Sequence, residues 1–405
     1  MGPLGPDRPQ VFKFGGACFL NLNDYQTVAR YIAGRLPDSG RIVAVVSAMS
    51  GVSGNLQKAQ QGLDSHSQSH SPVPETLTAG LMATADRVSA ILLATALSDL
   101  GVKAGTLEPA QGGMSAAGAA NRAHLTRLDP APLWVALTEN DVVVLAGGEA
   151  VDDRSHVVTL GRNSSDLSAV AAAVTLNAPC CEIFSDVPGV FTADPFLLPE
   201  AQLISELSYA AAMRMSRAGA KVLHPGALEM ASQQELPIIC RTRPPGAERG
   251  TLIAGTDAPA MVIADTRTAV WSFRDDVELD RVRRRLADEQ FDEQDTRSVV
   301  VDYEGVRHLV FPGGDPYGIA ERCCSFIPQV TGLRLITTVL GDQEPERVLV
   351  TEEELLPEAH RRHHLHYPEA KSKPRGEKHR SSMSQILLES APDGTPDEAS
   401  ERSAS

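Results

Sequence analysis

Short apolar runs alternate with amphipathic stretches through the first two-thirds of the chain. Three of the runs are almost continuously apolar, which predicts strands buried on both faces: Val11–Phe14, Arg41–Ser47 and Asp141–Leu145. Between them, apolar residues recur at helical spacing in Asn23–Leu36 and in the Ala/Leu-rich stretch Leu77–Leu100. This alternation predicts an α/β fold with a mainly parallel sheet and helices on both sides.

The pattern changes after about residue 255. Strands are predicted at 268–273, 296–303, 306–311 and 333–340, with helices at 277–289 and 316–326. This βαββαβ order is ferredoxin-like, an arrangement found in small ligand-sensing domains.

The last part of the chain, from about residue 343, is rich in charge, serine, histidine and proline. Such a segment cannot bury enough apolar area to offset the entropy of ordering it, so most of it is predicted to be disordered. Its HRRHHLH run at 360–366 is interpreted as an incidental basic tract. The predicted organisation is a flexible N-terminus, two domains and a tail, at residues 1–9, 10–256, 262–342 and 343–405.

Composition narrows the possible functions. A formal charge of −15 with 4% aromatic residues argues against nucleic-acid binding, which needs cations and stacking side chains. The six cysteines occur as two adjacent pairs and two single residues, a spacing typical of neither a disulfide framework nor a metal site. The N-terminus lacks the apolar segment of a secretory signal, and no run reaches the roughly 18 apolar residues of a membrane span. We therefore expect a cytoplasmic protein without nucleic-acid or membrane partners.

Two segments could bind phosphate. Lys13 ends a predicted buried strand and is followed by Gly15 and Gly16, so a cation would lie beside backbone N–H groups that no Cβ obstructs. Alone, this pattern also fits a plain strand-to-turn connection with a surface lysine. The second segment, 159–166, leads directly into the helix predicted from Leu167, where the helix dipole favours anions.

Two residues of the 159–166 segment have further candidate roles. Arg162 could bind a substrate carboxylate through two parallel hydrogen bonds. Asp166 could act near a transferring phosphoryl group, although its position beside the helix start also suits a simple N-cap. The sequence alone leaves both interpretations of Asp166 open.

Two later turns add charged residues. Segment 185–195 carries Asp186 and Asp194 around a Pro-Gly turn, and such a pair can hold a ribose or help to seat Mg²⁺ through water. Further on, Lys221 lies in an otherwise apolar stretch. His224 precedes a proline and has no acid or nucleophile beside it, so we interpret it as structural.

Together these segments resemble the amino-acid kinase superfamily and, within it, the aspartate kinases. The resemblance covers roughly residues 10–255 and rests on five motifs in family order: VFKFGG at 11–16, VVSAMSGVSGNL at 45–56, TLGRNSSDLSAVAAA at 159–173, SDVPGVFTADP at 185–195 and GAKVLHP at 219–225. It implies a three-layer αβα sandwich for these residues, and the βαββαβ region that follows is then interpreted as a single ACT-like domain. It also implies transfer of a phosphoryl group from ATP, with Mg²⁺, to an amino-acid side-chain carboxylate, foremost that of L-aspartate to give 4-phospho-L-aspartate.

The resemblance also implies a role for each matching residue. The catalytic pair would be Lys13, which stabilises charge on the transferring group, and Asp166, which organises the centre. The other residues divide into two groups by the ligand they would hold. The nucleotide would contact Gly15, Gly16, Ser185, Asp186, Phe191, Asp194 and Lys221. The amino acid would contact Ser47, Ser53, Asp86 and Arg162.

The sequence departs from the family pattern mainly on the amino-acid side. Ala17-Cys18 stands where a Thr-Ser pair is expected, Asn163-Ser164 replaces two glycines, and Asp86 replaces a glutamate that binds the substrate's amino group. Three interpretations therefore remain: a divergent aspartate kinase, a kinase for another amino or carboxylic acid, or a non-catalytic nucleotide-binding partner. A uridylate- or carbamate-type kinase is a further alternative within the superfamily.

The predicted second domain bears on assembly and control. Aspartate kinases commonly carry two ACT modules, whereas this sequence fits one, without a clear effector-binding signature. Since an isolated module of this kind usually pairs with a second copy, the resemblance implies a homodimer. The pattern predicts no particular feedback effector.

Overall fold

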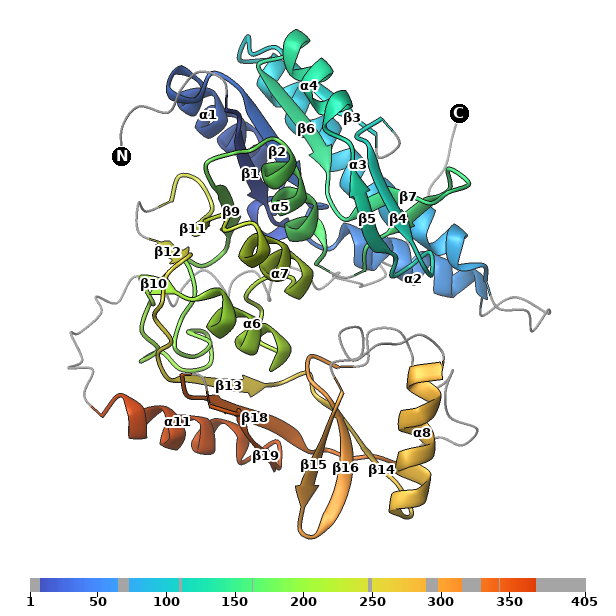
Figure 1. Cartoon of the computed structure of the whole chain (residues 1–405), viewed down its shortest axis with the longest axis vertical. Helices are drawn as coiled ribbons and strands as arrows, with labels where there is room; N and C mark the ends of the chain where they lie inside the picture. Colours follow the sequence, from blue (N-terminus) through green and yellow to red (C-terminus); the bar gives the residue numbers. More distant parts are fainter. Residues whose placement is uncertain are drawn as a thin grey trace, which may run out of the picture. The chain divides into compact units, whose positions relative to one another are not determined.

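The first 255 residues are built around an eight-stranded sheet (Figure 1). The computed structural model describes residues 8–64, 73–108, 111–161, 163–246, 250–288, 298–314, 329–341 and 343–368. The strands lie in the order β10-β12-β11-β9-β1-β2-β6-β3, and all neighbours are parallel except β11 and β12. Their bounds are β1 Gln10–Phe14, β2 Ile42–Val46, β3 Ala104–Leu107, β6 Val142–Ala146, β9 Cys181–Ser185, β10 Glu206–Leu207, β11 Ile238–Thr242 and β12 Gly250–Ile253. The mainly parallel sheet predicted from the buried apolar runs is confirmed.

Helices cover both faces of this sheet, which confirms the three-layer αβα sandwich. Successive side chains of a strand point to opposite faces, so Phe12 and Phe14 pack in one layer while Val11 packs in the other. The layer around Phe12 contains α1 (Leu22–Ser39) and α3 (Glu75–Ser98). The layer around Val11 contains α4 Pro130–Glu139, α5 Ser165–Thr175, α6 Tyr209–Arg217 and α7 Pro225–Gln233. The same alternation points Lys13 toward the α5 layer.

A second, four-stranded sheet lies beside the main one in the order β5-β4-β7-β8. Its strands are β4 Met114–Ala117, β5 His124–Leu128, β7 Glu149–Val151 and β8 Val157–Thr159, and β8 contacts α3. β7 follows β6 after only Gly147 and Gly148, and β8 leads into the loop before α5. Helix α2 (Val52–Asp64) packs on α3 as well.

The C-terminal region forms two further sheets, β15-β16-β14-β17 and β13-β18-β19 (Figure 1). The elements are β13 Met261–Asp265, β14 Ala269–Ser272, α8 Asp276–Asp288, β15 Val299–Tyr303, β16 Val306–Phe311, β17 Gln329–Val330, β18 Arg334–Val339, β19 Glu346–Val350 and α11 Leu355–His366. The elements predicted from 268 to 311 correspond to β14, α8, β15 and β16, whereas β13 was not predicted, and the helix predicted at 316–326 lies outside the described residues. The placement of the last predicted strand was wrong. This strand, β18, pairs with β13 and β19 instead of joining the sheet of β14 to β16.

The predicted disordered tail from residue 343 was also wrong in its first part, which contains β19 and α11. Val350, Leu355 and Ala359 bury against β13, β18 and the segment near Leu198. The high content of charged and histidine residues concealed this narrow apolar stripe, because the residues between its buried positions are exposed or half-buried and most of them are polar. Residues 369–405, and residues 1–7 of the predicted flexible N-terminus, lie outside the described residues.

Helix α3 is the one helix of the described part of the chain that is long and apolar enough to cross a membrane by length and composition. Its apolar residues have another explanation in this fold. Ala90, Leu93 and Leu97 are buried against α1 and the central sheet. The helix is therefore a core element of the sandwich.

Candidate active site

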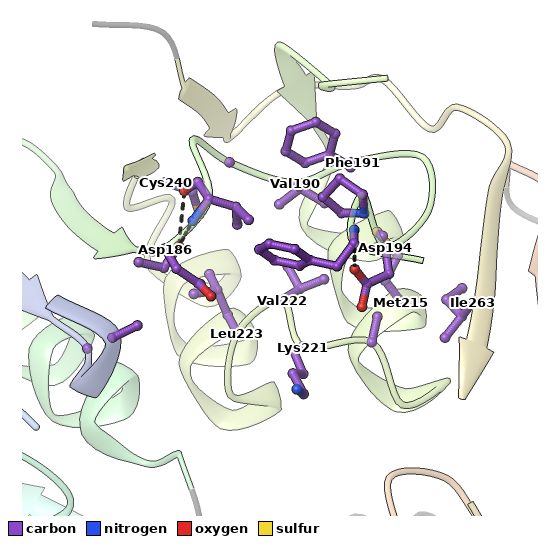
Figure 2. Close-up of a pocket in the computed structure, with 18 of the residues that line it drawn as sticks. Asp186, Val190, Phe191, Asp194, Met215, Lys221, Val222, Leu223, Cys240 and Ile263 are labelled. Atoms are coloured by element: carbon purple, nitrogen blue, oxygen red, sulfur yellow. Dashed lines mark hydrogen bonds between the residues drawn. The ribbon is translucent and has the colours of Figure 1, made fainter. Parts of the chain in front are cut away.

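A cavity of about 390 Å³ opens at the carboxyl ends of β1 and β9 (Figure 2). Ligands of open α/β folds bind at this edge of the sheet. Figure 2 shows Val190 and Phe191 on one side, Lys221, Val222 and Leu223 on another, and Ile263 of β13 closing a third. The cavity is lined by nine residues that the sequence singled out: Lys13, Gly15, Gly16, Asp166, Ser185, Asp186, Phe191, Asp194 and Lys221.

A buried ion pair lies in the wall of this cavity. Lys13 Nζ is 2.7 Å from Asp166 Oδ1, and the two residues are only 9% and 6% exposed. The pair forms because β1 points Lys13 toward α5, whose first turn carries Asp166. Burial by itself lowers the pKa of Lys13, but the charge of Asp166 and the hydrogen bond to it outweigh burial and leave that pKa above its ordinary value. Lys13 is therefore held as a cation beside the cavity.

Asp166 does not cap its helix. The N-cap position of α5 is Ser164, and the second carboxylate oxygen of Asp166 accepts a hydrogen bond from the backbone N–H of His224 at 3.2 Å. His224 in turn caps α7, since its Nδ1 accepts from the N–H of Gly226 at 3.1 Å. The structural interpretation of His224 is confirmed, and Asp166 links three elements at the cavity wall.

The backbone of the turn after β1 lies close to the backbone at Phe184 and Ala48. The N–H of Gly15 donates to the carbonyl of Phe184 at 3.1 Å. A Cβ added to Gly16 would lie 2.9 Å from the carbonyl oxygen of Ala48, closer than real Cβ contacts. Glycine is therefore required at this point, where the turn borders the cavity.

We expect Gly16→Ala to destabilise the fold by about 1–3 kcal/mol, because the turn must shift away from Ala48. Gly34→Ala is the matched control, since a Cβ at this helical position meets nothing within 4 Å. That control should raise stability by roughly 0.5–1 kcal/mol. Thermal unfolding of both variants measures these effects, and equal stability of the two would contradict the packing argument.

Segment 185–195 supplies the polar rim of the cavity. Asp186 is exposed, and Ser185 Oγ donates to the carbonyl of Val187 at 3.1 Å. The Asp194 carboxylate accepts from the N–H of Phe196 at 2.9 Å, which fixes its orientation at the edge. Lys221 is exposed on the opposite segment (Figure 2). The rim thus offers two carboxylates and one ammonium group around an apolar interior.

Two of the residues predicted to hold the amino acid, Ser47 and Asp86, lie next to this cavity and not in its lining. Ser47 Oγ is 2.7 Å from Ser165 Oγ, and Ser165 directly precedes Asp166. Asp86 Oδ1 accepts from the N–H of Ala48 at 2.7 Å. Burial raises the pKa of Asp86 to about 7, although this hydrogen bond and the charge of Lys13 oppose the shift. Ser53 is half-buried in α2, and Arg162 lies outside the described residues.

Glu149 is a buried carboxylate that the sequence interpretation missed. It is 1% exposed, and its Oε2 accepts from Arg87 Nε at 2.9 Å, while Arg87 also pairs with Glu108 at 3.0 Å. Burial raises the pKa of Glu149 to about 8 against the charge of Arg87, and Asp86 adds to the rise. A charged residue directly after a buried strand and two glycines was the available signal.

Comparison with known proteins shows the family to which the chain belongs. Residues 8–242, more than half of the chain, match the sequence profile of the amino acid kinase family. The chain belongs to the amino acid kinase family. Within it, the chain is 34% identical over 243 residues to an aspartokinase of Geobacillus stearothermophilus, covering 60% of this chain and 58% of that one. It is likewise 34% identical over 248 residues to an aspartokinase of Mycolicibacterium smegmatis, covering 61% and 57%. The match spans less than two-thirds of each relative.

Solved structures of amino acid kinases share the fold over a longer stretch. E. coli aspartokinase III in complex with aspartate and ADP superposes with a TM-score of 0.62 at 18% identity, covering 87% of this chain and 98% of that one. An aspartate kinase from Synechocystis gives a TM-score of 0.51 at 26% identity over 82% of this chain and 60% of that one. The likeness in fold therefore extends beyond the central sandwich into the C-terminal region.

Proposed function

We propose that this amino acid kinase transfers the γ-phosphoryl group of ATP to the side-chain carboxylate of L-aspartate, giving 4-phospho-L-aspartate and ADP. The observation that carries the proposal is the buried Lys13–Asp166 pair in the wall of a cavity lined by two glycines and a second lysine. The 34% identity to aspartokinases supports aspartate as the acceptor.

Different residues along the cavity bind the phosphates and the nucleoside of ATP. Gly15, Gly16 and Lys221 hold the phosphates, and the segment from Ser185 to Asp194, with Asp186 and Phe191, holds the nucleoside. A carboxylate oxygen of the acceptor attacks the γ-phosphorus as the bond to the bridging oxygen of ADP breaks. The Lys13 ammonium stabilises the negative charge that develops on the transferring group. The acceptor is already ionised at neutral pH, so no strong general base is required.

Mg²⁺ would accompany ATP as its counter-ion. Over the ranges that the structure describes, no group of three or more His, Cys, Asp or Glu side chains is placed to hold a metal ion. The phosphate oxygens and water would therefore supply most of the coordination, with Asp186 and Asp194 near enough to the rim to act through water.

The amino-acid side is formed by Ser47, Ser53, Asp86 and Arg162. Asp86 binds the acceptor's ammonium group, and Arg162 binds its α-carboxylate. Glu149, the second buried carboxyl group in this region, is paired with Arg87 and keeps its proton up to about pH 8, so it adds negative potential for the same ammonium group only above that pH. This cluster of two carboxyl groups also favours a second candidate function. The acceptor would then be a different amino acid, whose cationic group is placed differently from the ammonium group of L-aspartate.

An acceptor panel separates these functions. ADP release would be followed with L-aspartate, D-aspartate, L-glutamate, succinate and UMP, and we expect L-aspartate to give the highest kcat/KM. A higher value for another amino acid would transfer the proposal to that acceptor. Turnover with UMP alone would place the enzyme among the nucleotide kinases, and ATP binding without acceptor-dependent turnover would indicate a non-catalytic partner.

The acceptor KM should depend on pH through Asp86. Because burial raises the pKa of this carboxyl to about 7, it is mostly protonated at pH 6 and mostly ionised at pH 8. Only the ionised form attracts the ammonium group, so the KM for L-aspartate should fall by about tenfold over this range. Asp86→Asn should raise the KM and remove its pH dependence. If Asp86→Asn kept the wild-type pH dependence of the KM, Asp86 could not be the residue that binds the acceptor's ammonium group.

The free energy of unfolding should fall as pH rises, although acceptor binding improves. The folded protein keeps a proton on Asp86 up to about pH 7, whereas the unfolded chain releases it near the ordinary value of 3.8. The unfolding free energy therefore falls as pH rises from about 4 to above 7, and Asp86→Asn should be more stable than the wild type at pH 8. Denaturant unfolding of both proteins at pH 5 and pH 8 measures the difference.

We further propose that the enzyme is cytoplasmic and works as a homodimer, with the C-terminal region as an ACT-like module that pairs with its copy. The sheet of β15, β16, β14 and β17 supports this proposal, because it is antiparallel with α8 packed on it. Sedimentation equilibrium would give twice the 43.2 kDa chain mass for the dimer. A single species at the chain mass would rule it out.

A further inference from the structure

Helix α11 reaches the segment that lines the nucleotide side of the cavity. His363, in the last turn of α11, is 1% exposed, and its Nε2 is 2.9 Å from Oγ1 of Thr192. Thr192 is itself 3% exposed and stands between Phe191 and Ala193, which both line the cavity. A residue from a region without resemblance to the kinase motifs thus touches one of those motifs.

The hydrogen bonds around Thr192 place its hydroxyl between two partners. The N–H of Gln202 donates to Thr192 Oγ1 at 2.9 Å, which uses one of its two lone pairs. The bond to His363 Nε2 can run in either direction, because the hydroxyl keeps a second lone pair as well as its proton. The buried position of His363, which is 1% exposed on a helix packed against β13 and β18, favours its neutral form. A protonated imidazole would bring a charge into this buried contact.

Thr192 is also held through its backbone. Its N–H donates to the carbonyl of Gln202, and its carbonyl accepts from the N–H of Val262 in β13, both at 2.9 Å. Val262 lines the cavity as well. The side chain and the backbone of Thr192 therefore join α11, β13 and the 190–204 hairpin at one point behind the cavity wall.

The groups that face His363 set the balance of its titration. Burial is the main cause that lowers the pKa of His363, and His360, His364 and His366 of its own helix lower it further, while Glu200 opposes them. β13 and β18 present the uncharged side chains of Val262, Ala264 and Ile336 to the α11 packing cluster. Glu200 also pairs with His360, but both side chains are more than a third exposed, so this pair contributes little.

We propose that His363 is a positioning residue for the nucleotide: in its neutral form it holds Thr192, and with it the segment from Phe191 to Asp194, in the shape that receives the nucleoside. Protonation of His363 puts a charge at this buried contact, which loosens the packing around Thr192 and weakens nucleotide binding. The inference rests on the proposed nucleotide site. It makes α11 a pH-sensitive support of that site.

Calorimetric titration of the full chain with ADP, at pH 8 and pH 5.5, tests the inference without an acceptor. ADP affinity of the wild type should fall on the order of tenfold more between these pH values than that of His363→Gln, whose amide can accept the same hydrogen bond without titrating. The comparison cancels protonation of the ADP phosphates, which is common to both proteins. Thr192→Val, which keeps the shape but removes the hydroxyl, should bind about tenfold more weakly at pH 8.

His364→Ala is the matched control, since it removes an exposed histidine one position away, and it should behave as the wild type. Equal pH dependence in wild type and His363→Gln would overturn the inference, even if Thr192→Val failed to fold. Absence of ADP binding by the wild type at either pH would instead overturn the proposed function. If ADP binds but its affinity is the same in the His363 and Thr192 variants as in the wild type, the proposed function stands and only the role of His363 as a positioning residue is excluded.

Discussion

Lys13→Met is expected to lower kcat by on the order of a thousandfold, with a smaller effect on the KM for ATP. Among the described residues that line the cavity, Lys13 is the one cation that is both buried and fixed by a carboxylate, and it lies near the carboxyl end of β1. A charge held in place before the reaction stabilises the developing negative charge without the cost of reorganising water. Methionine keeps the length and apolar stem of the side chain and removes only the charge.

The control for this experiment is Lys103→Met, because Lys103 is exposed between α3 and β3 and lies outside the cavity lining. It should retain wild-type turnover. Steady-state kinetics of ADP release with L-aspartate measure both variants. A Lys13→Met enzyme within about tenfold of wild type would remove Lys13 from the catalytic centre.

Asp166→Ala should destabilise the fold by about 3–5 kcal/mol, because it leaves the buried Lys13 ammonium without its counter-charge. The pKa of Lys13 would then fall, since burial would act on it unopposed by Asp166. The variant should also lose turnover, as the neutral amine no longer stabilises the transferring group. Two losses of different origin are thus expected from one substitution.

A double variant distinguishes the two losses. Lys13→Met with Asp166→Leu replaces the ion pair by apolar side chains, which often restores stability at buried pairs. We expect unfolding free energy to return to within about 1 kcal/mol of wild type while turnover stays at the level of Lys13→Met. A double variant as unstable as Asp166→Ala would show that Asp166 supports the fold through its bond to His224 more than through Lys13.

The central sandwich and the position of Lys13 and Asp166 at one cavity could be predicted because their signals are local. Val11–Phe14 is a continuous apolar run, and strand alternation then directs Lys13 to the face where α5 begins. Glycines at 15 and 16 mark the turn on the cavity side. Those signals lie within a few residues of each other in the sequence. Because the strands are parallel, the motifs that follow them meet at one edge of the sheet.

The C-terminal region was less predictable because its pairing is non-local. Strand β18 has the same apolar character whether it pairs with β14 or with β13, and only the presence of β19 and α11 decides the second arrangement. His363 shows the same limit: within the run of histidines and arginines at 360–366, nothing in the sequence marks it as the one histidine of that run that is buried. Glu149 was missed because a carboxylate after two glycines suits a surface turn equally well.

The most direct test of the proposed activity is the yield of hydroxamate per ADP when the enzyme, MgATP and L-aspartate react in the presence of hydroxylamine. Hydroxylamine converts an acyl phosphate into a stable hydroxamate, so the product identifies the bond that formed. We expect one aspartyl hydroxamate for each ADP released, and neither product from Lys13→Met. Acceptor-dependent ADP release without hydroxamate would contradict phosphorylation of a carboxylate.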